Sequence, residues 1–373
     1  MSAQRLAETA TLGSLLFDSD QFEQVARWLR SGDFADPWHA EVYVAMREHL
    51  AAGKRVEPEG VGRQLLERVG PRRADLPRIA GLLHATPVRP RPLGYAAMVL
   101  ESSLRREVAC QGVMLRAAAL SAALAQESRP VIAVTAMVEG TLVAGEQRWQ
   151  LASGDTPTAV ASTCPSLRPV LRNTDGALGA DRLLAAHPEM DQREVCAHEQ
   201  RLIAALICHP ARVPAVARWL RPDAMVDRSW CSAYSALVDL VERGEPADVV
   251  TVAWEIQRAS RKLGAGPDTD TLVRAVDAAV ADDPGYLGRL VASDLVRRTA
   301  DSAASALATA ATNPGVDIRD LFDTGRLLAG SVRLAAAGLP DSAGDSVPGR
   351  HLQPVRSELV SASPAAHAGP VAG

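Results

Sequence analysis

The sequence contains the same unit twice. The string VARWLR occupies residues 25–30 and returns unchanged at 216–221, an offset of 191 residues. The same offset, held without a gap, aligns further identical residues of the two segments: Glu8 with Glu199, Leu15 with Leu206, Asp36 with Asp227, Tyr43 with Tyr234, Gly53 with Gly244, Val61 with Val252 and Tyr95 with Tyr286. A register held from residue 8 to residue 95 predicts two copies of one structural unit.

Apolar residues recur at helical spacing in each copy. In the first copy they form two stripes, made of Leu12, Leu15 and Leu16 and of Val25, Trp28 and Leu29. Spacings of three and four residues place such side chains on one face of a helix. Because Trp28 and its counterpart Trp219 belong to these stripes, we expect both indole rings in the core.

Capping residues mark where the next helix begins and ends. Asp36 supplies an N-cap, and Pro37 stands at the first helical position, where a missing N–H does no harm. Gly53 stops this helix in the first copy and Gly244 stops it in the second. A further helix is expected around Val61 and its counterpart.

Each copy then continues as a long Ala-rich stretch, over residues 93–124 in the first and 284–311 in the second. A break at 127–130, or at 313–315 in the second copy, precedes one more helix. A long helix, a turn and a second helix predict an αα-hairpin.

The sequence therefore predicts an all-α chain of two repeats, each a compact helical head plus an αα-hairpin, joined by a flexible linker. The predicted parts are 1–150 for the first copy, 151–190 for a Pro/Ser/Thr-rich linker, 191–337 for a diverged second copy and 338–373 for a disordered tail. A short helix is expected inside the linker, near residues 179–186.

Composition supports a helical protein and argues against several classes of protein, namely all-β, nucleic-acid-binding, secreted and membrane proteins. Hydrophobic residues make up 47% of the chain and aromatic residues only 4%, too few for most all-β folds. A net charge of −4 provides no global basic field for nucleic acid. The five cysteines form no regular framework, and no leader peptide or run of about 18 strongly apolar residues is evident. We expect a cytoplasmic protein without membrane contact.

Several stretches of the first copy share a family pattern: residues 8–18 (ETATLGSLLFD), Asp33-Phe34, residues 39–46 (HAEVYVAM), Gly53, Tyr95 and residues 104–106. Over about residues 6–143 they resemble the N-terminal domain of bacterial replicative DNA helicases of the DnaB family. The resemblance implies a helical head followed by a helical hairpin, a role as docking surface, and packing of hairpins from neighbouring subunits into a ring collar. Since one chain carries two such hairpins, we expect them to make this contact within the chain, as an intramolecular pseudo-dimer. Two independent units joined by the linker are the alternative.

The second copy resembles the same domain more weakly, over residues 196–335. Trp230 stands where the first copy has His39, and Ala224-Met225 stands where it has Asp33-Phe34. These departures separate the second copy from the family pattern at three of its matching positions.

The motor that follows this domain in the family has no counterpart in the sequence. A phosphate loop reads GxxxxGK[ST], whereas the only Gly-Lys pair among the 373 residues, Gly53-Lys54, is followed by Arg. The backbone cradle and lysine of such a loop hold the phosphates of ATP. We therefore expect a protein that is no enzyme, with no catalytic residues and no cofactor.

Cysteine and histidine lie close together in the second copy, at Cys196, His198, Cys208 and His209. If they share one helix, twelve residues separate the two ends by about 18 Å. Zinc ligands lie about 2.0 to 2.3 Å from the ion, so one ion cannot use both ends. We expect no metal site. His39 is expected to form a hydrogen bond or to pack, because its sequence neighbours supply no catalytic partner.

Two arginine pairs in the hairpins are the candidate interaction residues: Arg105, Arg106, Arg297 and Arg298. We favour a solvated helix face, given the acidic charge balance. An interface with an acidic helix or with DNA is the alternative interpretation.

The leading functional hypothesis is a non-enzymatic interaction or scaffold module of DNA replication. Its partner would be a replicative helicase, a primase or another copy of itself. The alternative, which we do not favour, is an accessory DNA-binding protein of a plasmid or phage-like element that uses the Arg-bearing hairpins. A degenerate helicase that retains ATP binding is the third hypothesis, and the missing phosphate loop argues against it.

Overall fold

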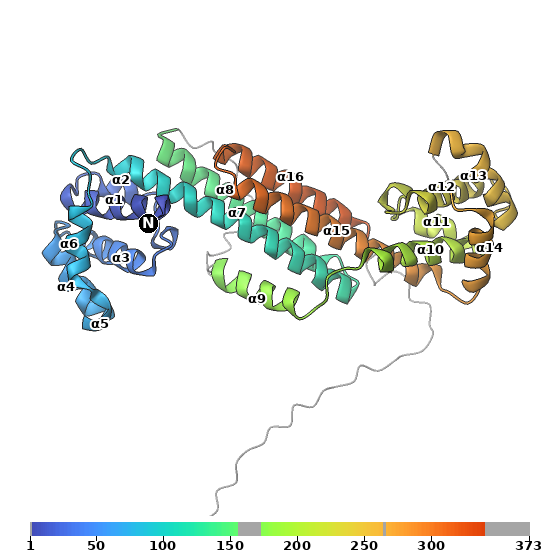
Figure 1. Cartoon of the computed structure of the whole chain (residues 1–373), viewed down its shortest axis with the longest axis horizontal. Helices are drawn as coiled ribbons and strands as arrows, with labels where there is room; N and C mark the ends of the chain where they lie inside the picture. Colours follow the sequence, from blue (N-terminus) through green and yellow to red (C-terminus); the bar gives the residue numbers. More distant parts are fainter. Residues whose placement is uncertain (1, 156–172, 264–265, 340–373) are drawn as a thin grey trace, which may run out of the picture. The chain divides into compact units, whose positions relative to one another are not determined.

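The computed structural model describes residues 2–155, 173–263 and 266–339. Within these residues every regular element is a helix, so the predicted all-α class is confirmed (Figure 1). The predicted tail lies outside the described residues from position 340 onward. Each copy consists of a head of short helices and a hairpin of two long helices, as predicted.

Apart from the short elements α5 and η2, the two heads contain equivalent helices in the same order. The first has α1 (Ala3–Phe17), α2 (Phe22–Ala26), the 3-10 turn η1 (Ser31–Asp33), α3 (Pro37–Ala51), α4 (Pro58–Val69), α5 (Pro71–Ala74) and α6 (Leu76–His84). The second has α10 (Gln192–Cys208), η2 (Pro210–Arg212), α11 (Val213–Ala217), η3 (Pro222–Ala224), α12 (Arg228–Glu242), α13 (Val249–Leu263) and α14 (Thr269–Ala278). Helix contacts correspond as well, since α1 packs on α6 and α10 packs on α14.

The residues predicted to cap the helices do so in the structure. The Asp36 carboxylate accepts the Trp38 N–H at 2.9 Å, and Asp227 accepts the Ser229 N–H at the same distance. Gly53 and Gly244 follow α3 and α12 with φ of 69° and 71°. Residues other than glycine rarely adopt this left-handed conformation, which explains why both copies place glycine there.

The long helices of the two hairpins lie within one residue of their predicted bounds, and the further helix expected in each hairpin is present. The first consists of α7 (Pro92–Ala125) and α8 (Arg129–Ser153), and the second of α15 (Pro284–Thr312) and α16 (Ile318–Ala337). Helix α7 packs along α15 and α8 packs along α16, which joins the hairpins into one four-helix bundle (Figure 1). The expected pairing of the two hairpins within one chain is therefore present in the structure.

Helix α7 is the most apolar of the long described helices. Its length and composition are sufficient for a membrane span, and half of its most apolar window is buried inside the protein. It contacts α1, α8, α9 and α15. Such burial is typical of the central helix of a bundle, where apolar residues face neighbouring helices on several sides.

Part of the predicted linker is helical. Residues 173–185 form α9 (Asn173–Ala185), which packs against α7. The helix expected near 179–186 thus exists and begins earlier than expected. Residues 156–172 of the predicted linker lie outside the described residues.

The gap-free register of the duplication does not extend to Tyr95 and Tyr286. Pro92 begins α7 and Pro284 begins α15, an offset of 192. Buried positions follow this new offset, as in Val99 with Val291 and Leu104 with Val296, whereas Tyr286 is 50% exposed. The second copy therefore has one additional residue before its hairpin, and the matching tyrosines are not equivalent.

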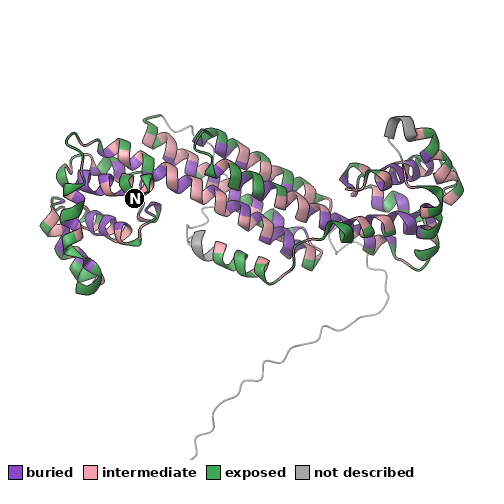
Figure 2. Cartoon of the chain, in the orientation of Figure 1, coloured by how far each residue is buried: buried purple, intermediate pink, exposed green. Residues whose placement is uncertain are grey.

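The prediction that both tryptophans lie in the core is confirmed for Trp28 and only partly confirmed for Trp219. Trp28 is 2% exposed and lies in the core, as predicted. Trp219 is half-buried and packs against the core, with its ring edge over Gly288 of α15. Figure 2 shows buried residues in both heads and along the long helices of the hairpins. The helical stripe correctly indicated the face of Trp219 but not the depth of its burial.

Candidate protein-interaction site: the paired hairpins

Arg105, the first candidate residue, connects the two copies. Its guanidinium donates hydrogen bonds to the Asn313 carbonyl at 3.0 Å and to the Val316 carbonyl at 2.6 Å, in the turn between α15 and α16. Glu101, one turn earlier on α7, accepts from the same group at 2.8 Å. Arg105 thus satisfies carbonyl groups at the end of a helix of the other copy.

Arg106 and Arg298 connect each head to its own hairpin. Arg106 donates to the Asp33 carbonyl at 2.6 Å, and Arg298 donates to the Ala224 carbonyl at 2.9 Å. Asp33 and Ala224 are equivalent residues, so the contact is conserved between the copies. Arg297, on α15, is half-buried and within electrostatic range of the Asp294 carboxyl.

A buried ion pair stabilises the junction of the first head and hairpin. Asp33 is 3% exposed, pairs with the Arg148 guanidinium of α8 and accepts the Ser103 hydroxyl of α7 at 2.8 Å. Arg148 also donates through Nε to the Trp28 carbonyl at 2.9 Å. The second copy has Ala224, Ala335 and Leu295 at the positions of Asp33, Arg148 and Ser103. Both charged partners are therefore replaced together, which leaves no single buried charge.

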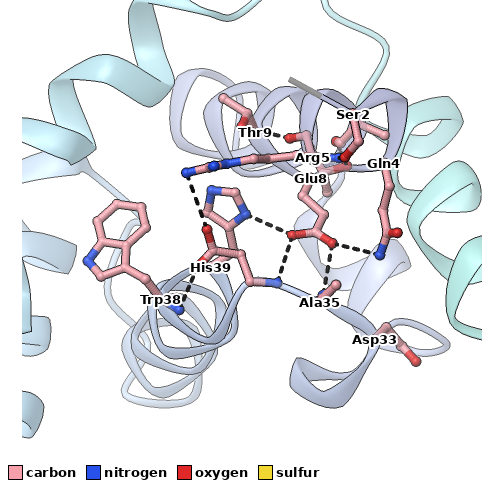
Figure 3. A network of polar contacts seen from close by, with 12 residues as sticks. Ser2, Gln4, Arg5, Glu8, Thr9, Asp33, Ala35, Trp38 and His39 are labelled. Atoms are coloured by element: carbon pink, nitrogen blue, oxygen red, sulfur yellow. Dashed lines mark hydrogen bonds and ion pairs between the residues drawn. The ribbon is translucent and has the colours of Figure 1, made fainter.

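Glu8 is the centre of a second buried network (Figure 3). Its carboxylate accepts the Ala35 N–H at 2.8 Å and the Asp36 N–H at 3.3 Å, and lies 2.8 Å from His39 Nδ1. Burial acts to raise the pKa of Glu8, but the hydrogen bonds from His39 and the two amides lower it overall. His39 therefore forms the hydrogen bond expected for it and orients a structural carboxylate.

The equivalent carboxylate of the second head has a different environment. Glu199 accepts the Val226 N–H at 2.7 Å and the Asp227 N–H at 3.0 Å, but Trp230 replaces the histidine. Burial then raises the pKa of Glu199 above its ordinary value. The same backbone contacts persist in both heads, which identifies this glutamate as a structural feature of the repeated unit.

Small residues bring the paired hairpins close together. A Cβ placed on Gly112 of α7 would lie 3.0 Å from the Cα of Ala304 of α15. A Cβ on Gly325 of α16 would lie 2.9 Å from the Leu142 side chain of α8. Real Cβ atoms are rarely so close. Backbone atoms oppose the added Cβ at Gly112, so this crossing favours glycine, whereas the opposing atoms at Gly325 belong to the movable end of a leucine side chain.

Ion pairs line the edges of the same interface and join the two copies. Arg116 pairs with Asp301 between α7 and α15, and two further pairs join α8 to α16: Glu146 with Arg326 and Glu139 with Arg333, each at 2.7 Å. None of these residues was singled out from the sequence, because their pairing depends on how the hairpins cross.

The cysteine and histidine positions of the second head lie apart, as the helical spacing indicated. Cys196 and Cys208 are both on α10, near its beginning and at its last residue. In the described part of the chain, no group of three or more His, Cys, Asp or Glu side chains is arranged to hold a metal ion.

The fold and its contacts define a class: an all-α tandem of head-and-hairpin domains whose hairpins pack on each other. The family model "DnaB-like helicase N terminal domain" matches residues 2–101 and again 191–282, together just over half of the chain. The chain therefore belongs to this family, as a tandem duplication of the N-terminal domain.

Two curated relatives match this chain over only a small part of their own length. The replicative DNA helicase DnaB of Mycobacterium leprae is 30% identical over 131 residues, which are 34% of this chain and 21% of the helicase. The DnaB helicase of Rhodothermus marinus is 27% identical over 125 residues, 34% of this chain and 13% of that protein. The chain thus matches about a fifth or less of these curated relatives. No solved structure matches the chain significantly.

Proposed function

We propose that this chain is a non-enzymatic interaction module of DNA replication that docks on a replicative helicase or a primase, or pairs with itself. The observation that carries the proposal is the presence of two copies of the DnaB-type N-terminal domain, both with head and hairpin, in 373 residues without a phosphate loop. The proposed units are 1–150 and 191–337, separated by 151–190 and followed by the tail 338–373, and the proposed compartment is the cytoplasm.

The contacts of the arginines favour protein interaction over DNA binding. Arg105, Arg106 and Arg298 donate hydrogen bonds to backbone carbonyl groups of the same chain. Guanidinium groups held in this way are less available for phosphate contacts, and the net charge of −4 opposes nonspecific attraction to DNA. We therefore do not favour the DNA-binding alternative.

Binding to purified partners tests the proposal. The full chain is titrated against the replicative helicase and the primase of the same cell, and separately against duplex and single-stranded DNA. We expect binding to one of the two proteins whose affinity changes little between about 50 and 200 mM salt, because helix faces rather than phosphates are contacted. DNA binding that falls steeply over this range, without binding to either protein, would contradict the proposal.

ATP hydrolysis tests the non-enzymatic part. We expect turnover by the purified chain to equal that of a mock preparation, since the sequence contains no GxxxxGK[ST] phosphate loop. Turnover above the mock level that a substitution in this chain abolishes would show that the protein is an enzyme.

A further inference from the structure

The two hairpins are related by an approximate two-fold axis. Equivalent residues differ by 192 between α7 and α15, as the shared start at Pro92 and Pro284 shows, so Gly112 corresponds to Ala304. These two residues are in contact with each other. Contact between equivalent positions occurs at the axis of a two-fold interface.

The second pair of helices follows the same symmetry. Equivalent residues of α8 and α16 differ by 187, as the buried pairs Val131 with Ile318 and Leu142 with Ala329 indicate. By this relation Glu139 corresponds to Arg326, and Glu146 corresponds to Arg333. Both interface positions are thus glutamate in the first copy and arginine in the second.

The ion pairs across the interface are reciprocal. Glu139 lies 2.7 Å from Arg333, and Glu146 lies 2.7 Å from Arg326. If each residue of the second hairpin is given the number of its equivalent in the first, each contact joins position 139 of one hairpin to position 146 of the other. The symmetry therefore uses the same pair of positions twice, once on each side of the axis.

We propose that these four charges restrict the hairpin surface to a hairpin of the opposite type, so that the chain closes on itself and does not pair copy to like copy. A pair of two first-copy hairpins would place Glu139 against Glu146 on both sides. A pair of two second-copy hairpins would place Arg326 against Arg333 on both sides. Only the pairing of first with second copy gives two attractive contacts.

Other contacts favour the same pairing. Arg116 pairs with Asp301, but the equivalent positions are Ala308 and Ala109, so neither like-with-like pair contains this contact. At the axis, two second-copy hairpins would place Ala304 against itself. A Cβ at position 112 already lies 3.0 Å from the Ala304 Cα, so that arrangement is sterically crowded.

Two full-length variants with identical net charge test the proposal. E146R/R333E places like charges at both contacts of the native pair and opposite charges at both contacts of each like-with-like pair. The control E139R/R333E exchanges the charges of one native ion pair and therefore keeps both native contacts attractive. The variants share R333E and differ only in which glutamate becomes arginine.

Mass in solution is the readout, measured by light scattering over a series of protein concentrations. We expect the native chain and the control at the mass of one chain, 39.5 kDa. We expect E146R/R333E to self-associate at least about tenfold more strongly than the control, since both native contacts become repulsive in this variant and stay attractive in the control. The like-with-like contacts between chains carry opposite charges in both variants, so the comparison isolates the loss of the native pairing. In about 1 M salt, where charges are screened within about 3 Å, the difference should disappear.

A second pair of variants, E139R/R326E and its control E146R/R326E, repeats the comparison if one variant loses its helical circular dichroism. Equal masses of variant and control in both pairs would overturn the proposal. A native chain with the mass of two chains would overturn the closure within one chain.

Discussion

Gly112 and Ala304 occupy equivalent positions in the two copies and lie against each other where α7 crosses α15, with 3.0 Å between a Cβ built on Gly112 and the Cα of Ala304. This self-contact gives a single chain an interface of the kind that usually joins two identical subunits. The duplication therefore accounts both for the repeated fold and for the surface that joins the repeats.

A larger side chain at this crossing should weaken the bundle. We expect Gly112→Val to lower the free energy of unfolding by about 1 to 3 kcal/mol, because backbone rather than a movable side chain opposes the new atoms. Gly140→Ala on α8 is the control, since nothing lies within 4 Å of a Cβ at that position. The control should raise stability by up to about 1 kcal/mol. Urea denaturation followed by circular dichroism measures both, and equal effects would contradict the close approach.

The two tryptophans should differ in their importance. Trp28 is 2% exposed, so Trp28→Ala should lower the free energy of unfolding by about 3 to 5 kcal/mol by emptying a large buried volume. Trp219 is half-buried, and Trp219→Ala should cost clearly less. Thermal denaturation of both variants compares them. A larger loss from the second substitution would show that the assigned burial is wrong.

The buried pair of Asp33 and Arg148 should act as a unit. Asp33→Ala leaves a buried guanidinium without its carboxylate and should cost about 3 to 5 kcal/mol. The double variant Asp33→Ala/Arg148→Ala should cost less than the sum of the single changes, since the second copy has alanine at both positions. A double-mutant cycle with strictly additive losses would contradict this coupling.

The two equivalent glutamates should respond to pH in opposite directions. The pKa of Glu8 is lowered in the fold, so its contribution to stability is present above about pH 4.5 and is lost as the pH falls below that value. Burial raises the pKa of Glu199, so its contribution is largest in acid and declines as the pH rises through its unfolded-state value.

Substitution by glutamine separates the two cases. At pH 7, Glu8→Gln should cost about 1 to 3 kcal/mol, because the contact with His39 depends on the carboxylate, and Glu199→Gln should cost less. The cost of Glu8→Gln should shrink below about pH 4.5. Denaturation midpoints measured from pH 7 to pH 3 provide the comparison, and an equal cost for both variants at all pH values would be inconsistent with the two environments.

Features that depend on neighbouring residues could be predicted from the sequence. Asp36, Gly53 and Pro284 act through caps and backbone conformation within a few residues, and the helix ends lie where these signals place them. The duplication could also be predicted from the sequence. The one error concerns Tyr95 and Tyr286, whose identity at the offset of 191 is coincidental, because the second copy has one additional residue before its hairpin. A chance identity at the end of an alignment cannot be distinguished from true equivalence without knowing which face is buried.

Features that depend on crossing geometry could not be predicted. Glu139 and Arg333 are 194 residues apart, and their contact follows only from the two-fold relation of the hairpins. Asp33 and Arg148 are 115 residues apart and meet only because the head packs on its hairpin. For the same reason the sequence favoured a solvated helix face for Arg105, with an interface as the alternative, and could not show that its acceptors are carbonyl groups of the second copy.

Disulfide trapping at the two-fold axis tests most directly whether the two copies pair within one chain. The full chain, with its five native cysteines replaced by serine, receives Gly112→Cys and Ala304→Cys together, or either one alone. The Cβ positions are 3.3 Å apart, close to the spacing of about 3.5 to 4.5 Å in disulfides. We predict an intrachain disulfide in the double variant and no linked dimers from either single variant. Free thiols in the double variant, or linked dimers from a single one, would contradict the pairing.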